Sequence, residues 1–416
     1  MGPLTDTAVN PTDEAATGLA DRVRANAGPL VAFCLFALFA LNFNAYRVFG
    51  DGAIPFDFTR YLFGEDVHPI SYQFGLALLD APFYGIGKLI SAAGLAEIQG
   101  APVGAAMISF AANAFVVGAA GAALVLLRGL RLPGAGFALA AAVFGMPLFY
   151  YGTFSPSYTH ASDALLLTTA AMLVFWYFRG GSLPALVLAG CVLGLATTVR
   201  YFNGAEAAAF VGSLMVLGHR RHALVAGAST VATAGLLFLI PVGLGVPTLV
   251  PGYTPEAALR FTPQASLEML FSNHRGLLVW SPVALLGFIG FARVFRTRVA
   301  NRPFLGTLVA MGAALLVAYS FIPFWDGGWS FSQRYLTGLF PIVVIGLAGL
   351  FEWRRIPTVA LASLAALWSV YLGLNHVFGA LQSDGAVQIA AMLGDGRRSA
   401  GDFFHLIVVY SKLRYL

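Results

Sequence analysis

Acidic side chains gather in one stretch of the chain, from Tyr46 to Pro102, between hydrophobic runs. Its six carboxylates are those of Asp51, Asp57, Glu65, Asp66, Asp80 and Glu97. A charge beside a bilayer is costly unless water, a partner or a function keeps it there. A carboxylate fixed at the mouth of a cavity can act as a general base on a hydroxyl group. This stretch is therefore where we first expect chemistry, with the hydrophobic remainder as its scaffold.

Two of these carboxylates are candidate catalytic bases. Asp51 lies between two glycines at the end of the first hydrophobic run, and Asp57 follows six residues later. We favour Asp51 because a scaffold holds a side chain most rigidly close to the end of a helix. The alternative is a plain turn, since an aspartate between glycines is common in loops.

Several basic side chains could bind an anion such as a phosphate. His274 and Arg275 directly precede a hydrophobic run, and donors at the start of a helix suit an anionic group. Arg334 ends a polar segment between two hydrophobic runs, and its planar guanidinium matches a phosphate. Arg200 follows another run, where it either snorkels to lipid headgroups or binds a lipid phosphate. The sequence leaves these two roles of Arg200 open.

Further polar and aromatic side chains are candidates for substrate contacts. They belong to two segments, 154–163 and 324–336, that separate hydrophobic runs. Tryptophan is expected at a membrane interface in any case, so the aromatic residues alone prove little. The candidate substrate-binding residues are Tyr158, His160, Trp325, Asp326, Trp329 and Gln333.

Composition decides which elements hold these residues. Hydrophobic residues make up 58% of the 416 positions and charged residues only 10%, whereas a soluble domain carries about 25% charged residues. Strand-like alternation is absent, so we predict an all-α polytopic membrane protein. The formal charge of +5 is scattered between runs, which argues against nucleic-acid binding. Cys34 and Cys191 lie within apolar runs and predict neither a disulfide framework nor a metal site.

The distribution of arginines predicts the topology. If the segment Tyr72–Leu95 lies on the outer surface without crossing, the arginine-rich loops share one side with Arg22 and Arg24, which places them in the cytoplasm. We then expect about eleven transmembrane helices and a helical first extracytoplasmic loop. The predicted spans are Leu30–Phe49, Val103–Leu127, Gly134–Tyr150, Asp163–Phe178, Leu183–Val199, Ala205–Leu217, Ala223–Leu244, Leu278–Phe291, Phe304–Pro323, Thr337–Phe351 and Thr358–His376.

The predicted domain organisation follows from these spans. Residues 1–27 form a disordered cytoplasmic tail, residues 28–378 the transmembrane domain, and residues 379–416 an extracytoplasmic C-terminal tail. The catalytic outer loop covers residues 48–102.

The order of these segments resembles the GT-C superfamily of integral-membrane glycosyltransferases, in particular bacterial relatives of the protein O-mannosyltransferases. The likeness extends from about residue 30 to residue 376. It rests on Gly50–Asp51, the predicted surface helix 73–87, and the segments 156–163, 272–282 and 325–336. The family usually carries Asp-Glu after the first span. Here Gly52 follows Asp51, so both Asp51 and Asp57 remain candidates for the catalytic place.

The resemblance implies an enzyme that uses a polyprenyl-phosphate sugar as donor, usually with inversion at the anomeric carbon. The acceptor would be a glycan, a lipid or a protein, on the outer face of the bacterial cytoplasmic membrane. Arg334, Arg275, His274 and Arg200 would bind the donor phosphate. No cofactor is indicated, apart from a candidate divalent cation at the first outer loop. The expected partners are these substrates and the lipid bilayer, with no nucleic acid.

Three other kinds of protein fit the composition. A lipid-linked glycan ligase shares the donor class and the outer arginines, but it would more naturally carry one long outer loop late in the chain. A transporter or flippase would place charges in the middle of the membrane, whereas here the acids gather at the outer ends of the spans. A structural membrane subunit would not need such an acidic and arginine-rich outer face.

Overall fold

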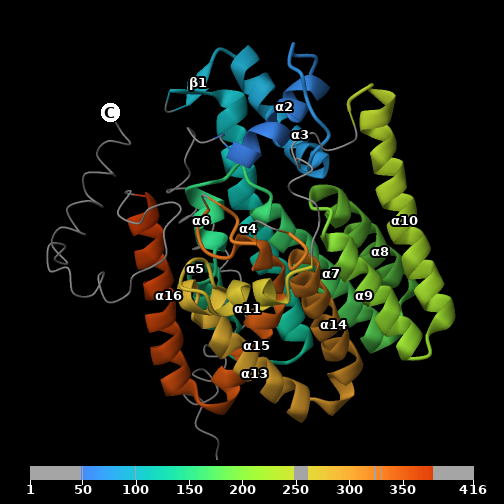
Figure 1. Ribbon diagram of the computed structural model, residues 1–416, viewed down its shortest axis with the longest axis vertical. Helices are drawn as coiled ribbons and strands as arrows, with labels where there is room; N and C mark the ends of the chain where they lie inside the picture. Colours follow the sequence, from blue (N-terminus) through green and yellow to red (C-terminus); the bar gives the residue numbers. More distant parts are fainter. Residues whose placement is uncertain are drawn as a thin grey trace, which may run out of the picture.

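The computed structural model of the protein describes residues 48, 50–98, 100–247, 261–322, 325–328 and 330–377. Within these ranges nearly all regular structure is helical (Figure 1). The one sheet there consists of β1 (Glu97–Ile98) and β2 (Ala101–Pro102), which pair antiparallel with Glu97 opposite Pro102. The predicted all-α class is confirmed.

The acidic stretch forms a separate layer at one end of the helix bundle, together with β1 and β2 (Figure 1). It consists of the 3-10 helix η1 (Gly50–Gly52), α2 (Ala53–Leu62) and α3 (Phe74–Ala92). The structure thus gives the predicted helical first loop, with α3 inside the predicted surface segment. Whether α3 stays outside the membrane remains a prediction.

The bundle contains the remaining helices. Their bounds are α4 Val103–Gly129, α5 Ala135–Gly145, α6 Leu148–Thr153, α7 His160–Gly180, α8 Leu183–Val199, α9 Asn203–Val216, α10 Arg220–Gly243, α11 Pro263–Phe271, α12 Leu277–Trp280, α13 Val283–Thr297, η3 Val299–Asn301, α14 Arg302–Tyr319, η4 Arg334–Leu339, α15 Phe340–Trp353 and α16 Arg355–Val377.

Close packing through glycine places α3 at the ends of other helices. A Cβ atom on Gly75 would lie 2.6 Å from the backbone nitrogen of Val199, at the end of α8, and one on Gly87 would lie 2.9 Å from Gly104 Cα, at the start of α4. The ring of Phe83 packs against Phe115, farther along α4. α3 therefore runs antiparallel to the first half of α4 and begins at the end of α8.

Six helices in the described ranges are long and apolar enough to cross a membrane. They are Val103–Gly129, His160–Gly180, Arg220–Gly243, Val299–Tyr319, Arg334–Trp353 and Arg355–Val377, and α5 and α8 are shorter apolar helices. The protein is a multi-pass membrane protein, and the number of eleven spans stays a prediction. The predicted span Leu30–Phe49 lies outside the described residues except for Val48, as do the tails 1–27 and 379–416.

Two predicted spans are interrupted where the sequence contains proline. The predicted span Gly134–Tyr150 divides into α5 and α6 at Met146, whose backbone is extended ahead of Pro147. The predicted span Leu278–Phe291 divides into α12 and α13 at Ser281, ahead of Pro282. A residue before proline avoids the helical conformation, and proline has no N–H to continue the hydrogen-bond ladder.

The short helices left by these breaks build an aromatic cluster at the end of the bundle that carries the acidic layer. Tyr150 of α6 stacks on Phe331 with ring centroids 4.6 Å apart. Trp280 of α12 packs edge-on against the same phenylalanine. Because Phe331 comes three residues before Arg334, this cluster fixes the approach of the chain to η4.

Arginine side chains mark the opposite end of the bundle. Arg179, at the end of α7, donates a hydrogen bond to the carbonyl of Gly129 at the end of α4. Arg298, after α13, pairs with Glu352 near the end of α15. These contacts join the ends of α4 and α7 and the ends of α13 and α15. They lie at the end of the bundle opposite the acidic layer, because α4 starts at that layer and ends at Gly129. The prediction that this end faces the cytoplasm, which follows from the positive-inside rule, stays a prediction.

Candidate active site

An ion pair joins the acidic layer to η4 across 283 residues of sequence. Arg334 Nη2 donates to Asp51 Oδ2 at 2.8 Å. The Asp51 side chain is 49% exposed and that of Arg334 only 10%. The Arg334 guanidinium also lies 5.3 Å from the ring centroids of both Tyr158 and Tyr335. The structure therefore brings Asp51, Arg334 and Tyr158 together with one carboxylate open to solvent.

The two glycines around Asp51 are needed for this contact. Gly50 has a positive φ of 55° and lies against the Tyr158 hydroxyl, and Gly52 lies against Ser157. A Cβ atom at either position would collide with these residues. The turn that the sequence offered as the alternative for Asp51 is therefore present, and it is what seats the carboxylate beside Arg334.

The segment 325–328 folds back over Arg334. Gly327, with φ 73°, is so placed that a Cβ atom would lie 3.0 Å from Arg334 Nε. Asp326 accepts a hydrogen bond from the Gly328 N–H, and its Oδ2 lies 3.6 Å from His274 Nδ1. The ring of Trp325 packs edge-on against His274. His274, Trp325 and Asp326 therefore lie beside the Asp51–Arg334 pair.

Two of the predicted ligands are buried supports. Arg275 is fully buried, donates to the His274 carbonyl at 2.7 Å, and lies over the ring of Trp280. Gln333 is also fully buried, and its amide donates to the Trp325 carbonyl at 3.0 Å. These side chains fix the backbones of His274 and Trp325, and their roles as ligands stay predictions. Trp329 lies outside the described residues.

Asp57 belongs to a different cluster. Its 45%-exposed side chain pairs with Arg60 in the next turn of α2, at 3.2 Å. Arg60 also donates to Glu65, which accepts hydrogen bonds from Tyr84 and Lys88 as well. Burial raises the pKa of Glu65, but these three hydrogen bonds outweigh it and lower that pKa to about 2. The cluster ties α2 to α3 and does not bring Asp57 to Arg334.

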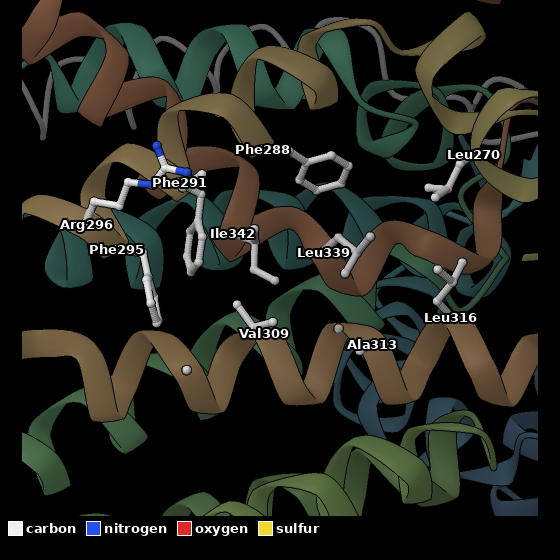
Figure 2. Close-up of a pocket in the computed structure, with 13 residues that line it drawn as sticks. Leu270, Phe288, Phe291, Phe295, Arg296, Val309, Ala313, Leu316, Leu339 and Ile342 are labelled. Atoms are coloured by element: carbon white, nitrogen blue, oxygen red, sulfur yellow. The ribbon is translucent and has the colours of Figure 1, made fainter. Parts of the chain in front are cut away.

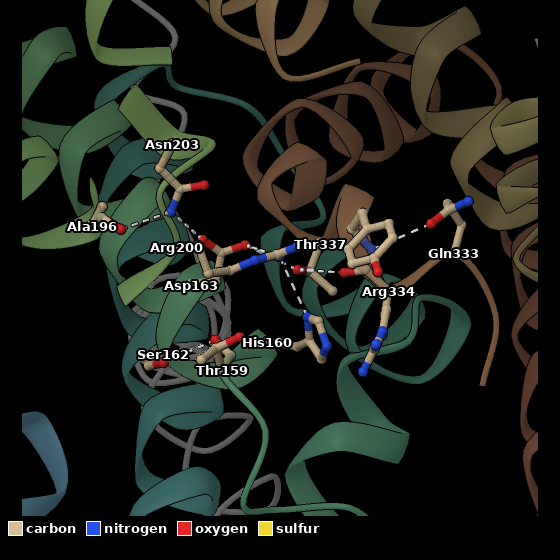
Figure 3. A network of polar contacts seen from close by, with 11 residues as sticks. Thr159, His160, Ser162, Asp163, Ala196, Arg200, Asn203, Gln333, Arg334 and Thr337 are labelled. Atoms are coloured by element: carbon tan, nitrogen blue, oxygen red, sulfur yellow. Dashed lines mark hydrogen bonds and ion pairs between the residues drawn. The ribbon is translucent and has the colours of Figure 1, made fainter. Parts of the chain in front are cut away.

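Asp163 is the carboxylate that the sequence analysis missed. It accepts hydrogen bonds from Arg200 Nη1 at 2.8 Å, Asn203 Nδ2 at 2.6 Å and Thr337 Oγ1 at 3.2 Å (Figure 3). Both side chains of the Arg200–Asp163 pair are buried: that of Arg200 is 3% exposed and that of Asp163 is 0% exposed. Asp163 therefore links α7 to α9 and to η4, the element that carries Arg334.

His160 connects this network to the open site. Its Nδ1 lies 3.4 Å from Arg200 Nη1, and its ring packs on Tyr151 and stacks on Tyr158. His160 is buried, so it touches the site through Tyr158 and not directly. The sequence analysis selected His160 because it lies in a polar segment between apolar runs. Asp163 lies in the same segment and could have been selected for the same reason.

An apolar groove of about 540 Å³ lies among α13, α14 and α15 (Figure 2). At one end it reaches Leu270 of α11 and Leu339, the last residue of η4, and at the other it reaches Arg296. The groove is not sealed from the outside, because Val309 on its wall is 47% exposed. Its lining includes Phe288, Phe291, Phe295, Val309, Leu316 and Leu339.

Among the described residues, no three His, Cys, Asp or Glu side chains gather as metal ligands. The two carboxylates considered as bases are paired with Arg334 and Arg60. The candidate divalent cation at the first outer loop stays a prediction.

Comparisons with known proteins give the fold. No family model matches the chain, and no curated protein matches it. The solved oligosaccharyltransferase AglB of Archaeoglobus fulgidus, in complex with an inhibitory peptide and a dolichol-phosphate, is similar with a TM-score of 0.52 and 13% identity. The match covers 88% of this chain and 56% of AglB. The apo form of an oligosaccharyltransferase from the same organism gives a TM-score of 0.49 at 14% identity, over 87% of this chain and 56% of that one.

The chain thus spans little more than half the length of these solved structures. The similarity to the AglB complex extends over most of this chain. The protein is a polytopic membrane protein with the GT-C fold.

Proposed function

We propose that the protein is an inverting glycosyltransferase that moves a sugar from a polyprenyl-phosphate donor to an acceptor. The reaction takes place at the Asp51–Arg334 pair, on the outer face of the bacterial cytoplasmic membrane. The observation that carries the proposal is the position of this pair. It combines an open carboxylate with a cation, and Arg334 belongs to the same short helix, η4, as Leu339, which lines the end of the apolar groove.

The chemistry needs one base and a cation. Asp51 accepts the proton of the acceptor hydroxyl as its oxygen bonds to the anomeric carbon. The bond from that carbon to the phosphate oxygen breaks, and the phosphate leaves with the electron pair. A phosphate is a good leaving group and needs little protonation, so one carboxylate suffices where glycoside hydrolysis uses two. Fixed cationic donors stabilise the charge that develops on the phosphate.

Arg334 and His274 are the phosphate ligands in this proposal. Arg334 uses Nη2 for Asp51, and its Nε has no hydrogen-bond partner within the described part of the chain. A buried guanidinium with an unused N–H is suited to an incoming anion. His274 lies next to Asp326 and follows α11, whose Leu270 borders the groove. Arg275 donates to the His274 carbonyl and Arg200 pairs with Asp163, so the proposal does not assign them to the donor phosphate.

The groove would hold the isoprenoid chain. Its walls are aromatic and aliphatic, and apolar walls with a few polar groups at one end are typical of a site for an amphiphilic ligand. The similar AglB structure contains a dolichol-phosphate, which supports a lipid phosphate as the ligand class. A lipid-linked glycan ligase would use the same groove, and it is the alternative that this observation also favours.

Turnover with defined donors tests the proposal. The purified protein in liposomes is given a polyprenyl-phosphate sugar and candidate acceptors, and released polyprenyl phosphate is measured by mass spectrometry. We expect Arg334→Ala to weaken use of the donor and Arg334→Lys to restore it only in part, because the planar fork is lost. Arg60→Lys is the matched control, since Arg60 also pairs with an exposed aspartate of the acidic layer.

Two outcomes would reject the proposal. Equal donor use by both Arg334 variants and the wild-type protein would make Arg334 a structural residue of the turn. Movement of intact donor across the membrane, without cleavage of the sugar–phosphate bond, would identify a flippase.

A further inference from the structure

A second, smaller pocket lies at Tyr335, the residue after Arg334. It has a volume of about 50 Å³ and shares no lining residue with the groove. Its walls come from the start of α3, the junction of α8 and α9, the end of α14 and η4. They include Tyr72, Gln73, Arg200, Tyr201, Tyr319 and Tyr335.

Arg200 gives this pocket its chemistry. Its side chain is 97% buried, yet of its nitrogens only Nη1 has hydrogen-bond partners among the described residues, Asp163 and His160. Nε and Nη2 therefore remain as a planar pair of donors on a residue that lines the pocket. Such a pair matches two oxygens of a carboxylate or phosphate. Because Arg200 lines the pocket, these donors can bind an anion that enters it.

The surroundings hold Arg200 in place. Asp163, which binds it, is itself fixed by Asn203 and Thr337. The rings of Tyr319 and Tyr335 stack with centroids 4.5 Å apart, and the Arg200 guanidinium lies 5.0 and 5.5 Å from them. Because these contacts already fix the Arg200 side chain, it loses little conformational entropy when it binds an anion.

The rim of the pocket shows backbone strain of the kind found at ligand sites. Gln73 has φ 56°, in the left-handed region that is unfavourable for a non-glycine residue. The Tyr201 hydroxyl donates to the Ser71 carbonyl at 2.9 Å and anchors this strained segment to the junction of α8 and α9. The rim is therefore held in a fixed shape next to Arg200.

We infer that this pocket binds an oxyanion of the acceptor, a carboxylate or phosphate close to the hydroxyl that is glycosylated. The inference rests on the proposed function. The pocket holds only a few heavy atoms, since about 10–15 Å³ accommodates one water, so it takes a small anionic group and not a sugar ring.

Position assigns this anion to the acceptor. The guanidinium carbons of Arg200 and Arg334 both lie within 5.5 Å of the Tyr335 ring centroid, hence at most about 11 Å apart. In the proposal, an acceptor anchored at Arg200 extends over up to this distance towards Arg334 and the Asp51 carboxylate that Arg334 binds. The donor chain has its own route along the groove. The two substrates would thus occupy separate pockets, the groove and the pocket at Arg200.

Binding of inorganic phosphate and of acetate tests the pocket without any need for turnover. Arg334→Gln removes the proposed donor site and serves as the background for equilibrium dialysis with labelled phosphate. We expect this variant to keep one phosphate site that acetate displaces. Adding Ile322→Phe, which fills the pocket from its wall, or Arg200→Lys, which removes the fork, should each raise the phosphate Kd at least tenfold.

Two results would overturn the inference. The first is that Arg334→Gln alone abolishes phosphate binding, and the second is that neither added substitution weakens it. In the Arg334 wild-type protein, Ile322→Phe should raise the acceptor KM and leave the donor KM unchanged. A rise in the donor KM alone would assign the pocket to the donor phosphate. If the wild-type protein binds phosphate but transfers no sugar, the proposed function is refuted and the anion site is not.

Discussion

Replacing Asp51 by asparagine isolates the role of its carboxylate. Asparagine keeps the size of the side chain and can still accept the hydrogen bond from Arg334 Nη2, but it cannot take up a proton. Because the Asp51 side chain is 49% exposed, its ion pair contributes about 0–1 kcal/mol to stability. Loss of general-base catalysis lowers the rate about 10²–10⁴-fold, which corresponds to about 3–5 kcal/mol in the barrier. Turnover should therefore collapse while the fold persists.

Asp57→Asn is the matched control. Asp57 is 45% exposed, pairs with Arg60 in the same layer, and loses a similar surface ion pair. Release of polyprenyl phosphate and the thermal midpoint are measured for both variants under the same conditions. We expect equal thermal midpoints within a few degrees and a rate loss only in Asp51→Asn.

The refuting results are distinct. If Asp57→Asn is inactive and Asp51→Asn is active, the acidic layer is catalytic but Asp57 is the base, and the observed pairing with Arg60 must change during turnover. If both variants keep near-normal transfer, neither aspartate is the base, and the assignment of the base to the acidic layer is refuted.

Three further predictions concern the scaffold. Asp163→Asn leaves the buried Arg200 without its counter-ion, so it should destabilise the fold by about 3–5 kcal/mol, measured by denaturant unfolding; a loss below 1 kcal/mol would contradict the buried network. Because the pKa of Glu65 is lowered to about 2, stability should fall as the pH decreases from about 4.5 towards 2, and Glu65→Gln should flatten this pH profile of the thermal midpoint. In a cysteine-free background, a cysteine at Glu97 should be labelled from outside the cell and one at Gly180 from the cytoplasm; the reverse pattern, with Glu97 labelled from the cytoplasm, would contradict the predicted course of α3 outside the membrane.

The scaffold could be predicted well where the sequence signals are local. The predicted span Leu183–Val199 coincides with α8, because Ser182 caps its start through the Ala185 N–H and Pro184 occupies its first turn. The breaks at Pro147 and Pro282 had equally local signals, but the apolar runs on either side of them concealed the interruption. Hydropathy measures burial in lipid, and it does not register a helix that ends within a continuous apolar stretch.

The site could be predicted only in part, because its contacts are not local. Asp51 and Arg334 were both candidates, yet nothing in the sequence joins positions 283 residues apart. Arg275 and Gln333 carried the same signals as Arg334, and they are buried supports. A polar residue at the end of an apolar run can face the site or brace the segment that does, and only tertiary packing decides between the two.

The burial of Arg200 is explained by its ion-pair partner and could not be predicted from its position in the sequence. The sequence allowed an arginine that snorkels to headgroups, but the buried carboxylate of Asp163 neutralises it where a headgroup would otherwise be needed. That carboxylate receives three hydrogen bonds, from Arg200, Asn203 and Thr337, so its burial is compensated. The same contacts fix η4, and with it Arg334, relative to α7 and α9. One buried aspartate therefore determines both the anion pocket at Arg200 and the position of the cation that meets Asp51.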